Sequence, residues 1–255
     1  MLIGLVALII ALLAGGQDTF LLNPNLKKEV KIYVEDKNRK SEIDHLIKQV
    51  EKDQKGFLKH RKKSIKKLTK LNTDFNSTRN QFDELLNEYH DQRVALQHRY
   101  LDREIEIRKL IESDEWDKIM EAVIGNPDKM KARKQVLASN NKMYDNLIKT
   151  CERKILNKDS QVRAKTFINQ HRATTEAFTE AFLDLSYRHL EPIRDYKATR
   201  NDFESIREQM SNQHKKYLDS VIDLRFDLVT LVTEKEWKGI SAELNTAFKK
   251  GKGGA

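Results

Sequence analysis

TRNQFDELLNEYHDQRVALQHRYLDREIEIRKLIESDEWDKI, residues 78–119, and TRNDFESIREQMSNQHKKYLDSVIDLRFDLVTLVTEKEWKGI, residues 199–240, are two copies of one stretch. The offset between them is 121 residues throughout, without a gap. Both tryptophans of the chain, Trp116 and Trp237, stand at the same place in the two copies. An internal repeat of this kind predicts one structural unit that occurs twice.

The composition of the chain favours long helices. Charged residues make up 34% of the 255 residues and hydrophobic residues 38%, with only 9 Gly and 3 Pro. So few helix breakers, together with many Lys, Glu and Leu residues, predict an all-α fold. The single cysteine, Cys151, excludes an intrachain disulfide.

Apolar residues in the repeated stretch recur every eleven positions. The first copy has Leu85, Leu96 and Ile107, and also Tyr89, Tyr100 and Ile111. Eleven residues over three turns predict nearly straight packing rather than a left-handed coiled coil. A helix of about 37 residues would be about 55 Å long, and it needs a partner along its apolar seam. We therefore expect each copy to form an antiparallel hairpin with the helix before it. The two tandem hairpins would be separate or joined in one four-helix bundle.

The same offset extends the repeat upstream, to a unit of about 100 residues. We divide the chain into an N-terminal anchor or signal segment (1–22), repeat 1 (23–124), a helical connector (125–144), repeat 2 (145–248) and a disordered tail (249–255). Residues 72–74 are expected to end the first long helix of repeat 1 and so form the turn of its hairpin. Glu191–Pro192 should do the same in repeat 2. The stretch 41–44 resembles a capping signal that marks a helix restart or a kink.

The tryptophan motif predicts a corner between two helices. Thr233 and Glu236 form a capping box, and Val232 with Trp237 forms a hydrophobic staple. The first copy keeps the staple, with Ile111 and Trp116 as its members, but has Glu112 in place of the threonine. We interpret these tryptophans as structural; the alternative is a binding pocket beneath them.

The N-terminus carries an unbroken apolar run, residues 2–14, which is shorter than the ~20 residues of a membrane-spanning helix. It is either a secretory signal cleaved before Gln17 or a retained single-pass anchor. We favour the anchor, because no Lys or Arg precedes the run. The first positive charges, Lys27 and Lys28, follow it, so the helical region would be cytoplasmic. Cleavage would make the protein secreted or periplasmic.

The net charge of +9 is concentrated in residues 27–70, which hold sixteen Lys or Arg and seven Asp or Glu. Next to a hydrophobic segment, this predicts contact with anionic lipid headgroups; the alternative is a solvated helix face. The candidate contact residues are Lys59, Arg61, Lys62, Lys63, Lys66 and Lys67. Nucleic acid is a less favoured partner, because no recognition motif accompanies the basic run.

No motif for catalysis, metal or cofactor binding is found. The chain has no His-Glu-x-x-His sequence, no cysteine pair and no phosphate-binding glycine loop. A carboxylate di-metal bundle needs Glu-x-x-His on two helices. Residues 42–45 fit this pattern, but the equivalent residues 163–166 do not. We expect a protein that is not an enzyme and binds no cofactor, with Cys151 as a buried apolar residue.

The sequence is not recognised over its whole length as a member of a known family. The helix-ending motifs, residues 231–236 and 110–115, resemble the Leu-Thr-x-x-Gln turns of Spy/CpxP-type periplasmic helical chaperones, although neither copy has the Gln. The layout of anchor, basic flank and tandem helices is similar to membrane-tethered, spectrin-like bacterial division regulators. Our leading hypothesis is a membrane-tethered helical scaffold or adaptor that binds protein partners. The alternative is an extracytoplasmic chaperone or stress-sensing module. Self-association into a homo-oligomer stays open.

Overall fold

The computed structural model describes residues 25–124 and 129–250, and every regular element in them is a helix. These helices are α2 (Leu26–Tyr33), α3 (Lys37–Thr73), α4 (Arg79–Lys109), α5 (Ser113–Ile124), α6 (Lys129–Lys154), α7 (Lys158–Arg194), α8 (Arg200–Val229) and α9 (Glu234–Lys250). The prediction of an all-α protein is confirmed. The predicted hydrophobic segment 1–22 and most of the predicted tail lie outside the described residues.

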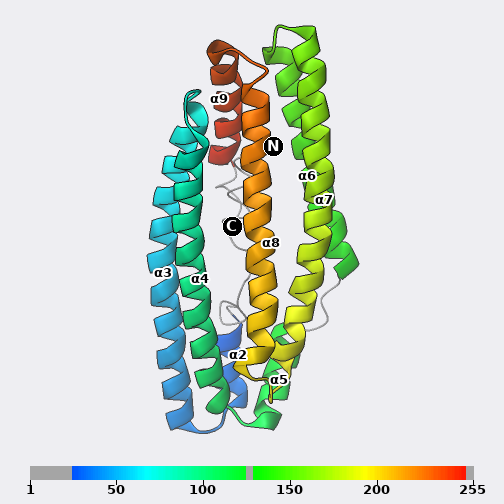
Figure 1. Ribbon diagram of the computed structural model, residues 1–255. Helices are drawn as coiled ribbons and strands as arrows, with labels where there is room; N and C mark the ends of the chain where they lie inside the picture. Colours follow the sequence, from blue (N-terminus) through cyan, green and yellow to red (C-terminus); the bar gives the residue numbers. More distant parts are fainter. Residues whose placement is uncertain (1–24, 125–128, 251–255) are drawn as a thin grey trace.

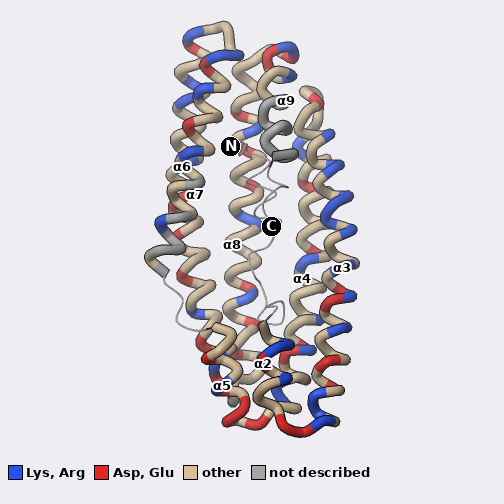
Figure 2. The backbone as a smooth tube through the Cα atoms, turned by 180° about the vertical axis from the view of Figure 1, so that it is seen from behind, with Lys and Arg blue, Asp and Glu red and all other residues tan. Residues whose placement is uncertain are grey.

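The four long helices lie side by side in the order α3, α4, α8, α7 (Figure 1). The chain reverses between α3 and α4 and again between α7 and α8. The shorter helices pack at the two ends of this layer. α2 packs against α5 at one end, and α6 packs against α9 at the other (Figures 1 and 2). Helices from the first half of the chain therefore meet helices from the second half along α4 and α8.

The first long helix restarts earlier than the capping signal at 41–44 suggests. α2 ends at Tyr33, and the side chain of Asp36 accepts a hydrogen bond from the backbone N–H of Arg39, 2.8 Å away. Asn157 does the same for Ser160 at the start of α7, at 2.9 Å. A carboxylate or amide oxygen at the N-cap satisfies a backbone donor that the helix itself cannot.

Pro192 does not end its helix. It lies in the last turn of α7, which continues to Arg194. The guanidinium of Arg108 on α4 donates hydrogen bonds to the carbonyls of Pro192 and Asp195, at 3.2 and 2.7 Å. A cation that bonds the last carbonyls stabilises a helix end, so the break falls at Asp195, three residues later than expected.

The eleven-residue seam forms the core. Leu96, Tyr100 and Ile107 on α4 are buried, as are Tyr217, Val221 and Leu228 on α8. Some polar residues between these positions are buried as well, among them Gln97 and Glu104 on α4 and Arg225 on α8. The apolar period thus decides which stripe of each helix turns toward the other helices.

Helix bounds recur at the offset seen in the sequence. α7 begins and ends 121 residues after α3, and α8 begins 121 residues after α4. α9 begins 121 residues after α5. α6 is longer than α2, because it also includes the predicted connector. No helix in residues 25–124 and 129–250 is apolar over enough length to cross a membrane.

Candidate functional site

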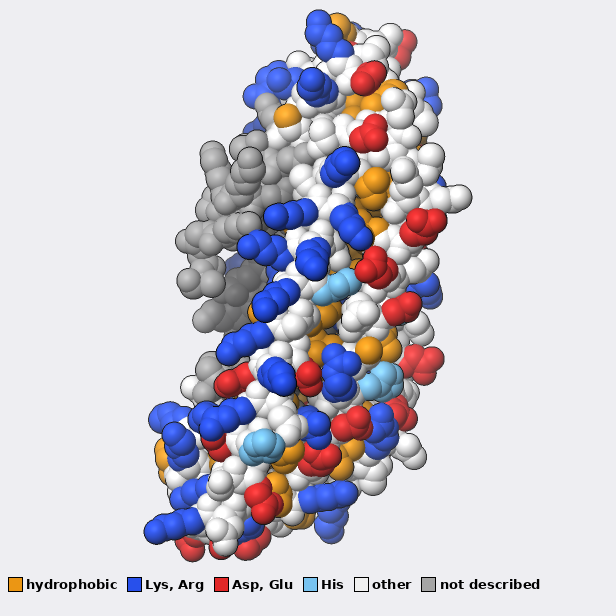
Figure 3. Space-filling view, turned by 90° about the vertical axis from the view of Figure 1, so that its left-hand side faces the viewer, with side chains coloured by type: hydrophobic (Ala, Val, Ile, Leu, Met, Phe, Trp, Pro, Cys, Tyr) orange, Lys and Arg blue, Asp and Glu red, His pale blue; other side chains and the backbone are white. Residues whose placement is uncertain are grey.

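Helix α3 carries a run, residues 54–73, that contains no acidic side chain. Its basic residues, which we name the basic face, are Lys55, Lys59, Arg61, Lys62, Lys63, Lys66, Lys67 and Lys70. The lysines are exposed and Arg61 is half-buried. Figure 3 shows basic side chains in a row along this side of the molecule. All six residues that the sequence singled out for contact with an anionic surface belong to this face.

Only one edge of the basic face has acidic neighbours. The ammonium of Lys67 lies 3.8 Å from a carboxylate oxygen of Glu88 on α4, and Glu84 lines the same shallow groove, about 400 Å³ in volume. In the described part of the chain, the other lysines of the face have no carboxylate within 4.0 Å. Like charges four residues apart on one helix repel each other. An anionic partner would relieve that repulsion.

The equivalent run on α7 has the opposite charge. Lys55, Lys59, Lys63 and Lys70 correspond, at the offset of 121, to Glu176, Glu180, Asp184 and Glu191. The two outer helices of the layer thus present opposite charges at matching places. Sequence reasoning missed this reversal, although aligning residues 55–70 with residues 176–191 would have revealed it.

Trp116 and Trp237 are both fully buried, each at a corner where a short helix leaves a long one. Each indole N–H donates to a backbone carbonyl from the other half of the chain. The acceptor for Trp116 is Arg194, at 3.2 Å, and the acceptor for Trp237 is Asn72, at 2.9 Å. Each tryptophan therefore closes the helix end that belongs to the other half. The sequence predicted corners but not this exchange between halves.

The staple residues lie where the motif predicts. Ile111 is buried in the same apolar cluster as Trp116, and Val232 packs at the edge of the cluster that contains Trp237. Thr233 accepts a hydrogen bond from the backbone N–H of Glu236 at 3.3 Å, and Glu236 accepts one from the backbone N–H of Thr233 at 2.8 Å. These two bonds make up a capping box.

An arginine covers each tryptophan corner. Arg108 lies over the ring of Trp116, with its guanidinium carbon 4.7 Å from the ring centre. Arg225 lies 5.4 Å from the ring centre of Trp237 and donates to the carbonyl of Asp74 at 2.8 Å. The two arginines do not occupy equivalent positions in the repeat. A guanidinium can stack on a ring and donate hydrogen bonds to carbonyls at the same time. An arginine can therefore contact the tryptophan and the neighbouring helix end from the position of Arg108 or from that of Arg225.

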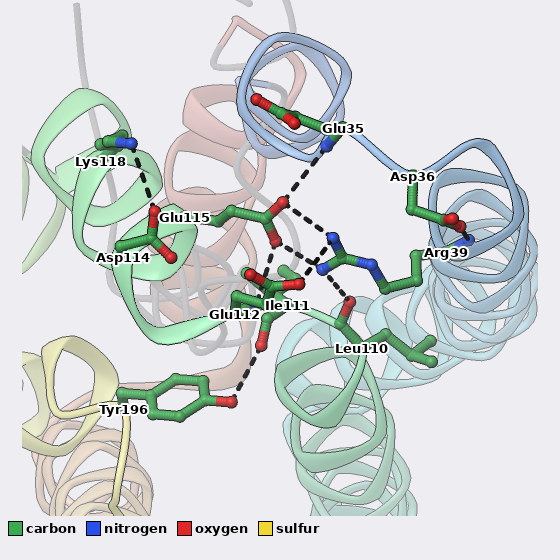
Figure 4. Close-up of polar contacts among 10 residues, drawn as sticks. All are labelled: Glu35, Asp36, Arg39, Leu110, Ile111, Glu112, Asp114, Glu115, Lys118 and Tyr196. Carbon is green, nitrogen blue, oxygen red and sulfur yellow. Dashed lines mark hydrogen bonds and ion pairs between the residues drawn. The ribbon is translucent and has the colours of Figure 1, made fainter.

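Glu115 joins three segments at the first corner (Figure 4). Its carboxylate accepts hydrogen bonds from the backbone N–H groups of Glu112 and Glu35, at 2.9 and 3.2 Å, and from the guanidinium of Arg39 at 2.6 Å. Burial raises the pKa of Glu115, but these hydrogen bonds outweigh it and hold the pKa below its usual value. The carboxylate thus stays charged at neutral pH.

The second corner repeats this arrangement without the arginine. Glu236 accepts from the backbone N–H of Leu156 at 2.7 Å, and Leu156 is the equivalent of Glu35. Ser160 stands where the first half has Arg39. Glu115 and Glu236 therefore make the same kind of backbone contacts at the two corners, whereas the ion pair with Arg39 is found only at the corner of Glu115 in the described residues.

Two reciprocal ion pairs join α4 and α8. Arg79 on α4 pairs with Asp223 on α8, and Arg200 on α8 pairs with Asp102 on α4. Arg200 is the equivalent of Arg79, and Asp223 of Asp102. The sequence showed that these residues recur, but not that they pair reciprocally. Reciprocal contacts are what a two-fold arrangement of equivalent units produces.

A buried charge cluster lies between α4 and α8. Glu104 has no exposed surface, and its carboxylate lies 3.3 Å from the guanidinium of Arg207 and 3.5 Å from that of Arg108. Burial raises the pKa of Glu104, and the two arginines oppose that shift. This cluster could not be recognised from the repeat, because the equivalent of Glu104 in the second half is Arg225.

Within the described residues, no group of three or more His, Cys, Asp or Glu side chains is arranged to hold a metal ion. Cys151 is buried, and burial raises the pKa of its thiol to about 12. It is therefore a neutral thiol at pH 7 rather than a reactive thiolate.

The chain matches no protein-family model, and comparisons with curated proteins and with solved structures give no match either.

Proposed function

We propose that this protein is a non-enzymatic helical scaffold or adaptor that binds a protein partner through the basic face of α3. The observation that carries the proposal is a row of exposed lysines on a long helix, most of them with no carboxylate within 4.0 Å among the described residues. The hydrogen bond from Trp237 to the carbonyl of Asn72 joins that helix to the second half of the chain. Fixed placement of a charged surface is what a scaffold needs to select a partner.

The architecture that we infer for the scaffold is an internal duplication that yields two tandem hairpins, α3–α4 and α7–α8. The recurring helix bounds and the reciprocal pairs formed by Arg79 and Arg200 support this inference. Because α4 packs against α8, we describe the two hairpins as one continuous layer. A rod built in this way presents its two outer helices to solvent on opposite edges.

The proposal includes a membrane tether formed by residues 1–22. An uncleaved tether with Lys27 and Lys28 behind it would leave the rod on the cytoplasmic side. N-terminal sequencing of the mature protein tests this part, since a start at Gln17 would remove the tether and place the rod outside the cytoplasm.

Exposed apolar residues bear on the chaperone alternative. In the described part of the chain the large ones are Ile32, Leu58, Met130, Val136, Leu156 and Val162. They are spread over α2, α3, α6, the turn before α7 and the start of α7. A cradle for unfolded chains needs a contiguous apolar patch. Their scatter favours the scaffold.

The test is capture of the full chain, tagged at its C-terminal tail, from crosslinked membranes. We expect a defined complex with the wild type that is lost with the quadruple variant Lys59→Glu, Lys62→Glu, Lys63→Glu, Lys66→Glu. A control variant makes the same charge change at four exposed lysines elsewhere, Lys149, Lys165, Lys216 and Lys235, and should keep the complex. Recovery of many unrelated unfolded proteins would contradict the scaffold and favour the chaperone.

A further inference from the structure

In the second half of the chain, α6 lies along α7 and covers one row of its residues. The side-chain amide of Asn140 donates to the hydroxyl of Thr179 at 3.3 Å. The hydroxyl of Tyr144 hydrogen-bonds to the ring of His171 at 2.7 Å. As a result His171, Thr175 and Thr179 are all buried. The middle of α7 thus has a helix on its outer side.

The equivalent row on α3 is Val50, Gln54 and Leu58. Val50 is buried, but Gln54 and Leu58 are less covered than their equivalents on α7. Leu58 is 42% exposed, whereas Thr179 at the same place on α7 is 6% exposed. α4 packs along α3, with α2 near the start of α3 and α9 near its end. Among the described residues, none of these helices takes the place that α6 takes along α7.

The charges beside this row decide which kind of helix fits there. On α7 the residues beside the row include Glu176 and Glu180, and Lys142 of α6 stands in the sequence between Asn140 and Tyr144, which contact the row. On α3 the sign is reversed, because Lys55 and Lys59 replace the two glutamates. The complementary helix for α3 is therefore acidic.

We propose that an acidic amphipathic helix of a protein partner docks along α3 between Gln54 and Lys66, in the place that α6 takes along α7. One apolar side chain of that helix packs on Leu58. Asp or Glu residues one turn to either side of it pair with Lys55, Lys59 and Lys62. The contact spans about three helical turns, or roughly 17 Å. This inference rests on the proposed function and names the chemistry of the partner.

Two other occupants fit the row less well. The residues at the offset from the first half of α6 are 8–21 of this chain, and Asp18 is their only acidic residue. They offer the lysines little charge complement. A lipid surface or a nucleic acid would use the lysines but has no need of an apolar side chain between them. The exposed Leu58 in the middle of the row favours a helix.

The experiment uses a synthetic peptide of residues 129–146 of this chain in which Lys131, Arg133, Lys134 and Lys142 are replaced by Glu. Its control is the unmodified peptide, which has the same apolar residues and the opposite charge. Fluorescence anisotropy measures binding of each labelled peptide to the full-length protein. We expect the acidic peptide to bind, with an affinity that falls as salt rises, and the basic peptide not to bind.

Protein variants locate the contact. The triple variant Lys55→Glu, Lys59→Glu, Lys62→Glu should weaken binding of the acidic peptide about tenfold or more. The matched triple variant Lys165→Glu, Lys216→Glu, Lys235→Glu should leave binding unchanged. The substitution Leu58→Ser should weaken binding several-fold at every salt concentration. The substituted lysines are all exposed to solvent, and Leu58 is 42% exposed. Circular dichroism checks that each variant stays helical.

Two outcomes overturn the inference. One is equal binding of the two peptides, or equal weakening by the two triple variants. The other has two parts: the protein binds vesicles that contain phosphatidylserine, and Leu58→Ser does not change its affinity for the acidic peptide. The basic face would then respond to charge alone. If the acidic peptide fails to bind but the full chain still captures a defined membrane complex through the basic face, the scaffold stands and only the helix inference fails.

Discussion

The two halves of the molecule keep the same joints but differ on their outer helices. Both have a buried tryptophan that donates to the other half, and both have a glutamate that caps the corner. By contrast, α3 is basic where α7 is acidic. The backbone hydrogen bonds of the tryptophans and glutamates are the same in kind at both corners. The charged side chains of residues 55–70 and 176–191 take no part in these bonds, and there the two helices differ in charge.

Breaking the buried charge cluster should have the largest effect, because Glu104 has no exposed surface and faces two guanidinium groups. Glu104→Ala would leave the guanidinium groups of Arg108 and Arg207 buried without their counter-charge. We expect a loss of about 3–5 kcal/mol in the free energy of unfolding, measured by urea denaturation. Glu106→Ala, an exposed position on the same helix, is the control and should change stability by less than about 0.5 kcal/mol. An equal effect of the two substitutions would show that the buried cluster contributes no more to the free energy of unfolding than an exposed glutamate does.

The tryptophan corners test how far the two halves are equivalent. Trp116→Phe and Trp237→Phe each remove an indole N–H that bonds a backbone carbonyl, and each leave unfilled space. We expect each to lower the free energy of unfolding by about 1–3 kcal/mol, with the two values within about 1 kcal/mol of each other. If one substitution proved neutral in denaturation experiments, the corners would not be equivalent joints.

Two buried histidines in α7 should make stability depend on pH. Burial lowers the pKa of His171 to about 4 and that of His189 to about 3, from 6.5. Below pH 6.5 the unfolded chain takes up protons that the folded chain does not, so the free energy of unfolding falls as pH falls. At pH 5 the loss is about 1–2 kcal/mol per histidine relative to pH 7.5.

The first half supplies the control for this pH effect. Val50 and Leu68, both buried, stand on α3 where α7 has these histidines. The double variant His171→Val, His189→Leu should therefore show a flatter profile of unfolding free energy between pH 7.5 and 5, whatever its absolute stability. An unchanged slope would contradict the assignment of the pH dependence to these two residues.

The ion pairs that cross between the halves should have the smallest effect. Arg79→Ala and Arg200→Ala each remove a partly exposed crossing pair together with a pair to Asp83 or Glu204 on the same helix. We expect each to lower the free energy of unfolding by about 1 kcal/mol or less. A double-mutant cycle of Arg79→Ala with Asp223→Ala measures the coupling directly. A cycle of Arg79→Ala with Asp102→Ala, which do not pair, is the control and should give no coupling. Equal coupling in the two cycles would argue against reciprocal pairing.

Much of the local structure could be predicted from the sequence. The eleven-residue period identified the buried stripe, because side chains at that spacing lie on one side of a helix. The capping box at Thr233 identified the start of α9, because it depends on residues three apart. Pro192 gave a wrong helix end, since the sequence could not show that Arg108 from another helix bonds the last turn.

The candidate site was likewise predictable from the sequence only in part. The lysines of the basic face were identified by composition, since a run without acidic residues needs no contact map. The exposure of Leu58 and the cover that α6 gives to α7 could not be predicted, because they depend on which helices lie side by side.

By itself, the sequence determined the helices, the repeat of 121 residues, the buried stripe and the basic run, because these follow from spacing and side-chain type. Only the tertiary structure decided that each tryptophan closes the other half, that Arg79 pairs with Asp223, and that Glu104 lies between two arginines. The tryptophan bonds, the Arg79–Asp223 pair and the Arg207–Glu104 pair join residues 78 to 165 positions apart. Such pairings depend on how whole helices pack, and no local pattern of residues encodes them.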